Sequence, residues 1–481
     1  MGRAAFRGSV FMGAAQAVQF ASSMISLLIV ARLLSPDDYG VVAMCTPITA
    51  FLLLFQDFGL SSATIQARSI SPEQVSTMAW LNVGISLVIA AILIAISPLV
   101  SAFYGDVRAG YFTAASALTV IVSGLSLQQL AMLTREHRFG ALAWTSTAGS
   151  LGNLGGAIVG ALVLRDYWAI FVGQVCAAVA GTLVPFLLSP WRPSLAFSIA
   201  KVRSLLGFGS ALTGFTLLNV VSRNADNLLI GRFWGPIQLG HYDVSYKLIL
   251  MPLNNVNAPM SRVMLPILAR VREEDTRFRH IFLSVLRGIT FLTMPGLIVA
   301  VALSDNLLPW ALGQHWRAAS PILFWLVLAG LFQPTNNVIG LLFVALGRGK
   351  ELFQFGIIRT ACIVAAFAIS VQFSVVALAS AYFWVTLVIS PANWLWGARG
   401  TPVRFLDILK AIAPIFFASG AVGLALRYVE HGVPFAVLLI VGTGTAYLAS
   451  FVVLLANPSA RKQVRDVGQM VRVVLMLGRR S

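Results

Sequence analysis

The chain has 481 residues, of which 58% are apolar and only 11% are charged, whereas soluble domains carry about 25% charged residues. This composition excludes an ordinary water-soluble protein and is sufficient for about a dozen or more membrane helices. The formal net charge of +17 would favour a nucleic-acid partner only if the basic residues gathered on one soluble face. They are spread between apolar segments instead, so we expect no nucleic-acid partner.

About fourteen apolar segments predict an all-α polytopic membrane protein. In chain order they cover residues 9–33, 41–65, 77–102, 111–133, 141–163, 167–189, 205–229, 240–261, 281–304, 319–346, 352–371, 374–395, 408–427 and 433–456. The first segment continues past a signal-like Ala15-Gln16-Ala17 to Leu34, so we expect it to be retained as a membrane helix. The intervening loops are too short for a soluble domain.

The distribution of Lys and Arg predicts the orientation, because positive residues are held on the cytoplasmic side during insertion. Most of them lie in segments on the same side as the N-terminus. The opposite segments hold only Arg32, Arg108, Arg165, Arg232, Arg317 and Arg427. We therefore expect both termini to be cytoplasmic. The basic tail, residues 459–481, has the pattern of an amphipathic helix on the anionic leaflet, or of a solvated end.

An internal repeat at an offset of 200 residues predicts two lobes. Arg, Pro and Gly recur in register in the segments 31–40 and 231–240, each preceded by a helix with a polar stripe. Six predicted spans separate the copies, so the lobes are expected to be parallel repeats related by an axis along the membrane normal. We predict an N-terminal six-helix lobe at 1–200, a C-terminal six-helix lobe at 201–400, two additional helices at 401–458 and the tail.

Several polar residues within the predicted spans are candidates for a transport path between the lobes. A cationic path favours an anionic cargo such as a diphosphate, because Arg and Lys supply charge-assisted donors to phosphate oxygens. The candidate substrate-binding residues are Asn219, Arg223, Lys247, Arg287 and Arg359. A structural role is the alternative for each cation, through an ion pair with a nearby Asp or by reaching outward to the membrane surface.

Two acids within the predicted spans, Asp226 and Asp57, are candidates for binding a coupling ion. The structural alternatives are a salt bridge to Arg223 for Asp226, and helix capping for Asp57. The sequence contains no recognisable catalytic motif or metal-binding cluster, so we expect no enzyme activity, cofactor or metal. The cysteines Cys45, Cys176 and Cys362 lie in apolar runs and are expected to be small buried hydrophobic residues.

An ordered set of blocks resembles the Wzx-type polysaccharide transporters, near the WzxC-like branch, of the MOP flippase superfamily. The blocks are ARLLSPDDYG at 31–40, DFGLSSATIQ at 57–66, REHRF at 135–139, NADNLLIGR at 224–232, LGHY at 239–242 and ALGR at 345–348. The resemblance implies a MOP flippase-like bundle of two six-helix lobes plus two helices in a bacterial inner membrane.

The same resemblance implies a flippase that moves polyprenyl-diphosphate-linked oligosaccharide units for exopolysaccharide, capsule or O-antigen biosynthesis. Its expected partners are the lipid-linked oligosaccharide, membrane lipid, and the polysaccharide polymerase and export machinery. The alternatives are a multidrug exporter of the same superfamily, which needs an apolar or acidic cavity for cationic drugs, and a membrane enzyme of polysaccharide assembly. A third alternative is a scaffold within a cell-envelope assembly, which the sequence does not exclude as a secondary role.

Overall fold

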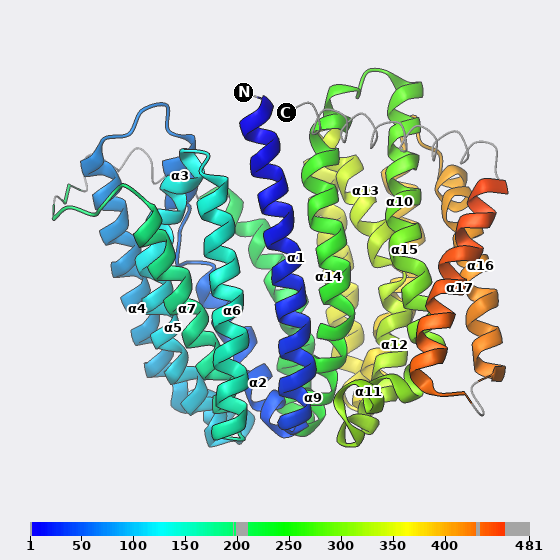
Figure 1. Cartoon of the computed structure of the whole chain (residues 1–481), viewed down its shortest axis with the longest axis horizontal. Coiled ribbons are helices and arrows are strands. Elements are labelled where there is room, and N and C mark those ends of the chain that lie inside the picture. Colours follow the sequence, from blue (N-terminus) through cyan, green and yellow to red (C-terminus); the bar gives the residue numbers. More distant parts are fainter. Residues whose placement is uncertain (1, 196, 199–209, 430–432, 457–481) are drawn as a thin grey trace. The chain divides into compact units, whose positions relative to one another are not determined.

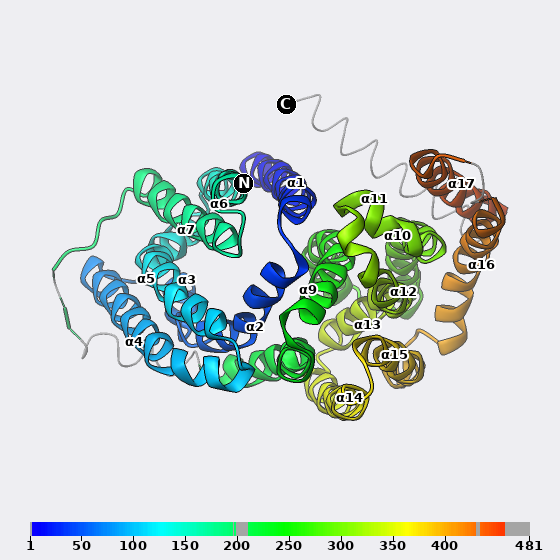
Figure 2. The same ribbon diagram turned by 90° about the horizontal axis from the view of Figure 1, so that it is seen from below.

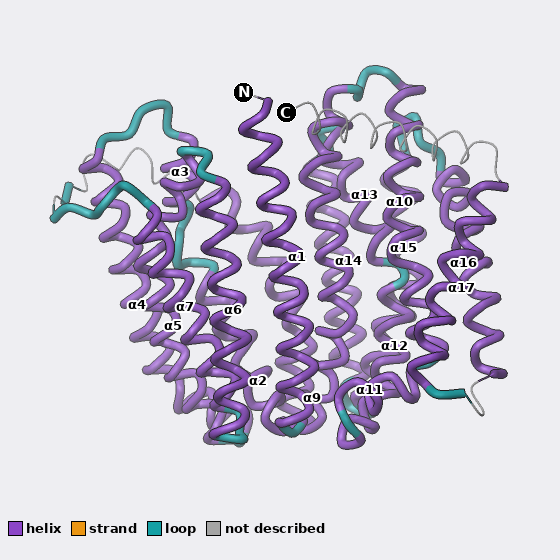
Figure 3. Tube along the Cα trace, viewed as in Figure 1, coloured by secondary structure: helices purple, strands orange, loops and turns teal. Residues whose placement is uncertain are grey.

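The computed structural model describes residues 2–195, 197–198, 210–429 and 433–456, and every regular element within these ranges is helical (Figure 3). The predicted all-α class is therefore confirmed. Internal contacts divide the chain into two compact units, Met1–Val244 and Ser245–Ser481. The lobe boundaries expected at 200, 400 and 458 stay predictions, and the amphipathic tail lies outside the described residues.

The first unit contains the helices labelled α1 to α7 in Figure 1 and the first part of α9. Their bounds are α1 (Gly2–Leu33), α2 (Pro36–Leu53), α3 (Leu60–Gln66), α4 (Pro72–Tyr104), α5 (Val107–Arg135), α6 (Phe139–Val163), α7 (Trp168–Leu188) and α9 (Ser210–Arg270). Within this unit α6 packs against both α1 and α7, and α4 packs against α5 (Figure 2).

The second unit contains the rest of α9 and all later helices. Their bounds are α10 (Asp275–Ala302), α11 (Ser304–Leu312), the 3-10 helix η2 (Gln314–Ala319), α12 (Ser320–Gly330), α13 (Gln333–Ala345), α14 (Gly349–Ser370), α15 (Val375–Ala398), α16 (Phe405–Val429) and α17 (Phe435–Ala456). Here α10 packs against α16, which packs against α17, and α15 lies against α12 and α14.

Among the described residues, eleven helical segments are long and apolar enough to cross a membrane. The chain is thus a multi-pass membrane protein. Of the remaining predicted spans, 41–65 falls in α2 with α3, and the described part of 205–229, from residue 210, and 240–261 fall in the two arms of α9. The count of fourteen stays a prediction, because these helices are more polar or are interrupted.

The two copies of the repeated segment turn the chain in different ways. In the first, Ser35 caps α2 with its side chain, Pro36 occupies the first turn, and Asp38 completes a capping box, which satisfies N–H groups that have no partner within the helix. In the second copy, Gly235 adopts φ 74° inside α9 and the helix continues beyond it after a kink. A positive φ of this kind is readily accessible only to glycine.

The repeated segments cross each other closely in the first unit. A Cβ atom added to Gly40 would lie 1.7 Å from the carbonyl oxygen of Pro236, and one added to Gly240 would lie 1.8 Å from the carbonyl oxygen of Pro36. The contacts are reciprocal, because each glycine faces the proline of the other copy. The absence of a side chain at both positions allows the two backbones to touch.

Many apolar side chains in both units face outward, as in Leu99 of α4 and Leu187 of α7. In a membrane protein the surrounding lipid is as apolar as the core, so burial inside the protein is not needed to keep such residues from water. The expectation for the cysteines was accordingly wrong in part: Cys45 is buried, Cys176 is intermediate and Cys362 is exposed on α14.

At the break between α12 and α13 in the second unit, the half-buried amide of Asn336 has three hydrogen-bond partners. Asn336 donates to the hydroxyl of Ser390 at 2.8 Å and accepts from the indole of Trp394 at 2.9 Å and from the amide of Asn393 at 3.3 Å. These bonds join α13 to α15. Interhelical bonds of this kind are available in lipid, where an unpaired polar group finds no water.

Candidate functional site

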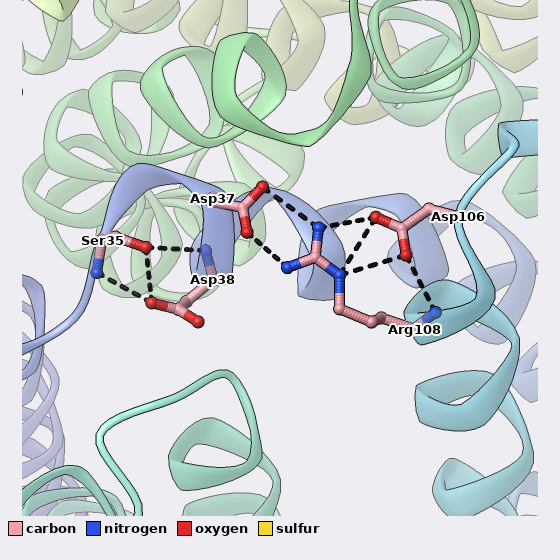
Figure 4. A network of polar contacts seen from close by, with 5 residues as sticks. All are labelled: Ser35, Asp37, Asp38, Asp106 and Arg108. Atoms are coloured by element: carbon pink, nitrogen blue, oxygen red, sulfur yellow. Dashed lines mark hydrogen bonds and ion pairs between the residues drawn. The ribbon is translucent and has the colours of Figure 1, made fainter.

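The first polar site lies where α2 begins, beside the turn between α4 and α5 (Figure 4). Arg108 forms ion pairs with Asp37 of α2 and with Asp106, and its Nη2 lies 2.7 Å from Asp106 Oδ2. Asp106 also accepts from the backbone N–H of Arg108 at 2.9 Å and caps α5. One guanidinium thus ties the first turn of α2 to the first turn of α5.

The electrostatics of this site follow from its composition. The hydrogen bonds that the Arg108 side chain donates hold the pKa of Asp106 below its usual range, against the opposing effect of burial. The Asp106 carboxylate is therefore ionised at neutral pH. The group is suited to anchoring helices and offers no free cation for an anionic ligand.

The second polar site is buried in α9, on the two sides of its kink. Asp226 is only 4% exposed, accepts from the phenol of Tyr242 at 2.8 Å and accepts from the backbone N–H of Asn227 at 2.9 Å. Asp243 and His241 are also buried close to the crossing of the repeats. A buried carboxylate that accepts from neutral donors is able to bind and release a proton.

The structure places the predicted substrate-binding residues in different units. Asn219 and Arg223 lie on the first arm of α9, but their side chains are outside the described part of the structure. Lys247 on α9 and Arg287 on α10 are half-buried in the second unit, and both take part in polar or electrostatic interactions. Arg359 is exposed on α14.

Asp57 has a structural role in the first unit. Its Oδ1 accepts from the backbone N–H of Ser61 at 3.0 Å and from the Ser61 hydroxyl at 2.6 Å, so the carboxylate caps the start of α3. This is the capping alternative that the sequence left open. The role of Asp57 in ion coupling stays a prediction.

Sequence reasoning missed two features of these sites. It counted Arg108 only as a loop cation, although an acid two residues before it and another at the start of α2 were available as partners. It also missed Tyr242 as the partner of Asp226, because sixteen residues and a kink separate them. The repeat itself was the available signal for Tyr242, since it lies beside Gly240 at the crossing.

Comparison with known sequences gives a family match over more than half of the chain. The family described as "Polysaccharide biosynthesis protein" matches residues 29–321. The lipopolysaccharide biosynthesis protein WzxC of Escherichia coli (strain K12) is 24% identical, over 76% of this chain and 75% of its own length. The succinoglycan biosynthesis transport protein ExoT of Rhizobium meliloti (strain 1021) is also 24% identical, over 94% of this chain and 92% of its own.

Solved structures share the fold at low sequence identity. The lipid II flippase MurJ in an inward closed conformation matches with a TM-score of 0.75 and 13% identity, over 93% of this chain and 98% of its own. An inward-facing multidrug resistance MATE transporter of the MOP superfamily matches with a TM-score of 0.66 and 14% identity, over 82% and 96%. The predicted MOP flippase-like fold is confirmed.

Proposed function

Because the chain belongs to the family of polysaccharide biosynthesis proteins, we propose that it flips polyprenyl-diphosphate-linked oligosaccharide units across the bacterial inner membrane. The observation that supports this proposal most strongly is the fold, which extends over nearly the whole chain and is shared with a lipid II flippase. Relatives named for polysaccharide biosynthesis and transport support the same class of cargo. The mechanism proposed is alternating access, without catalysis.

In this proposal the substrate-binding groups are cations within membrane helices. Lys247 and Arg287 are half-buried. Burying a cation within a membrane helix is costly unless it contacts an opposite charge, a polar group or an anionic ligand. Together with Asn219, Arg223 and Arg359 they are assigned to the diphosphate, whose oxygens accept charge-assisted hydrogen bonds.

The proposed coupling group is Asp226, with Asp57 as the second candidate. Asp226 is fully enclosed and accepts from a phenol and an amide N–H, so protonation removes a buried charge without breaking an ion pair among the described side chains. Asp57 holds the start of α3, so a change in its charge would also disturb that helix.

The proposal places both termini in the cytoplasm and makes the polysaccharide polymerase and export machinery functional partners. The positive-inside distribution of Lys and Arg supports this orientation. It is tested by reacting engineered single cysteines near the termini, in a variant without the native cysteines, with an impermeant thiol reagent applied to intact cells. Labelling of a terminal cysteine from outside the cell contradicts the orientation.

The function is tested by deleting the gene and extracting the lipids. We expect surface polysaccharide to disappear while a complete lipid-linked repeat unit accumulates on the cytoplasmic leaflet. An incomplete repeat unit would instead indicate a biosynthetic enzyme. Unchanged polysaccharide with increased sensitivity to cationic drugs would indicate the multidrug exporter, which has the same fold.

The cation assignment is tested by complementing that deletion with Arg359→Gln. We expect export to fall about tenfold or more, as expected when one charged contact to a phosphate is lost. The matched control is Arg272→Gln, an exposed arginine in the α9–α10 turn whose ion pair with Glu273 spans 3.6 Å. Normal export by Arg359→Gln at a normal amount of protein in the membrane removes Arg359 from the substrate path.

A further inference from the structure

Two turns, one in each unit, have the same backbone structure. The turn from α5 to α6 passes through His137 with φ 54°, and the turn from α13 to α14 passes through Gly347 with φ 72°. In each turn the next residue is an arginine, Arg138 or Arg348, whose backbone N–H donates to the carbonyl five residues earlier, at 2.9 and 2.8 Å respectively. We call these two segments the basic turns.

The arginine side chains of the basic turns also make equivalent contacts. Arg138 donates through Nη1 to the carbonyl of Leu188, at the end of α7, at 2.7 Å. Arg348 donates through Nη1 to the carbonyls of Gly397 and Arg399, at the end of α15, at 3.1 and 2.9 Å. Each guanidinium therefore holds a helix start against the end of the following helix, and the equivalent positions differ by 210 residues.

The two basic turns differ in their charge balance. In the second unit Glu351, the third residue of α14, accepts from Arg348 Nε at 2.7 Å and from Nη2 at 2.6 Å. The indole of Trp396 donates to the same carboxylate at 3.0 Å. The third residue of α6 is Ala141, and among the described residues no carboxylate pairs with Arg138.

An open pocket of about 370 Å³ occupies this part of the first unit. The N-terminal half of α1, the start of α6 and the end of α7 meet there (Figure 1). The lining combines two basic side chains with aromatic and aliphatic ones: Phe11, His137, Arg138, Phe139, Trp144 and Leu188. Trp144 is 65% exposed and Phe11 is 57% exposed, so the apolar wall faces outward.

We propose that this pocket binds the phosphate of an anionic glycerophospholipid, with the phosphate in the place that the Glu351 carboxylate takes in the second unit. Only Nη1 of Arg138 bonds Leu188, so its other guanidinium N–H groups are available. In the first turn of α6 the Phe139 N–H donates to the His137 carbonyl, and the next N–H groups lack partners within the helix. Both kinds of donor favour a phosphate oxygen. Glu136, the acid of this turn, does not line the pocket.

The apolar part of the pocket selects a lipid over free phosphate. Phe11 and Trp144 are exposed on membrane helices, and a tryptophan at the end of such a helix is typical of the level of the lipid headgroups. Basic pockets between membrane helices bind anionic headgroups in the same way. The phosphate therefore lies at the basic turn, and the acyl chains run along α1 and α6.

The second unit supplies the decisive variant. Ala141→Glu places a carboxylate at the position equivalent to Glu351, where it competes for Arg138 without removing the contact to Leu188. Ala141→Gln has nearly the same shape without the charge and is the matched control. The purified full chain is mixed in separate samples with phosphatidylglycerol, with phosphatidylcholine and with a polyprenyl diphosphate, and the bound lipid is counted by native mass spectrometry.

We expect the unmodified chain and Ala141→Gln to prefer phosphatidylglycerol over phosphatidylcholine by about fivefold, as expected for one cation at a lipid surface. Ala141→Glu should abolish this preference while its thermal unfolding stays unchanged. Equal binding of both lipids by the unmodified chain, or an unchanged preference in Ala141→Glu, would overturn the proposal. Loss of polyprenyl diphosphate binding alone in Ala141→Glu would assign the pocket to the cargo and also overturn it.

This test is independent of the proposed transport function. It measures retention of a phospholipid by the purified chain, and it has a definite outcome whether or not the deletion strain accumulates a lipid-linked oligosaccharide. A lack of transport leaves the phospholipid site standing, and a lack of phospholipid preference leaves the transport proposal standing.

Discussion

The crossing of the repeats and the basic turns are two regions in which equivalent residues of the duplicated chain can be compared. At the crossing, both copies keep the same proline and glycine, and each glycine touches the proline of the other copy. At the basic turns the backbones agree, but Glu351 in one copy is replaced by Ala141 in the other. The crossing keeps its contacting proline and glycine in both copies, although the charges beside them differ, whereas the basic turns keep the arginine and differ in its acidic partner.

The difference has a physical cause. At the crossing each copy is the other's neighbour, so a larger residue in either one meets a backbone that cannot move aside. Each basic turn instead packs within its own unit, where one partner can change without affecting the other copy. The proposed lipid site is therefore at a turn where a change of charge does not disturb the crossing.

The largest effect is expected from filling the crossing. Gly40→Ala and Gly240→Ala each put a Cβ within 2 Å of a proline carbonyl oxygen, so the helices have to separate at a cost of about 3 kcal/mol or more. We expect both variants to lose folded protein, measured as the monodisperse fraction after extraction in detergent. Gly84→Ala is the control, because no atom lies within 4 Å of its added Cβ. If only one crossing variant is damaged, the contact is not reciprocal in solution.

The next effect separates the two basic turns. Arg348→Ala removes bonds to the carbonyls at the end of α15 and leaves the Glu351 carboxylate with the Trp396 indole alone, whereas Arg138→Ala removes only a bond to Leu188. We expect the thermal unfolding midpoint to fall at least about twice as far for Arg348→Ala. The double variant Arg348→Ala with Glu351→Ala should recover part of the loss. Equal shifts for the two arginines would show that the acidic partner adds nothing.

A smaller effect is expected at the ion pairs of Arg108 with Asp37 and Asp106, beside the crossing. The second copy has no equivalent of these ion pairs, because Ile237 stands at the position that corresponds to Asp37. The pKa of Asp106 is held down by Arg108, so its contribution to stability is present above the usual carboxyl pKa and is lost as pH falls through the lowered value. Asp106→Asn should lower the free energy of unfolding by less than about 1 kcal/mol at neutral pH. On acidification the variant should lose less stability than the unmodified chain. Thermal unfolding midpoints of the variant and the unmodified chain, at pH 7 and below pH 4, measure this difference. If acid lowers both midpoints equally, the ion pair of Asp106 with Arg108 does not contribute to the pH dependence.

The smallest effect is expected from exchanging the turn residues. His137→Gly relieves the cost of a left-handed conformation in a residue with a Cβ, partly offset by a more flexible unfolded chain, so we expect a gain of about 0.5 kcal/mol. Gly347→His should lower the free energy of unfolding by a similar amount. Thermal unfolding measures both. A loss on His137→Gly would show that the imidazole itself holds the turn.

Much of the fold was predictable because lipid imposes a strong pattern on the chain. The apolar segments predicted most of the long helices of both units, although the spans predicted at 41–65 and 319–346 are each interrupted. The matched Pro and Gly identified two segments that cross, while the two six-helix lobes stay a prediction. The contacts within the candidate site were harder to predict from the sequence. The capping role of Asp57 was one of two alternatives, and the phenol of Tyr242 was not anticipated as the partner of Asp226, because hydrogen bonds across a kink leave no periodic signal.

The sequence by itself determined the helical class, the membrane-spanning character and the family, because apolar length and local capping residues act over a few turns of chain. Only the tertiary structure decided which polar groups meet. The Arg108 bridge, the reciprocal glycines and the exposed basic turn at Arg138 each join residues from separate helices. Their energies depend on distances of a few ångströms, which the packing of the helices sets.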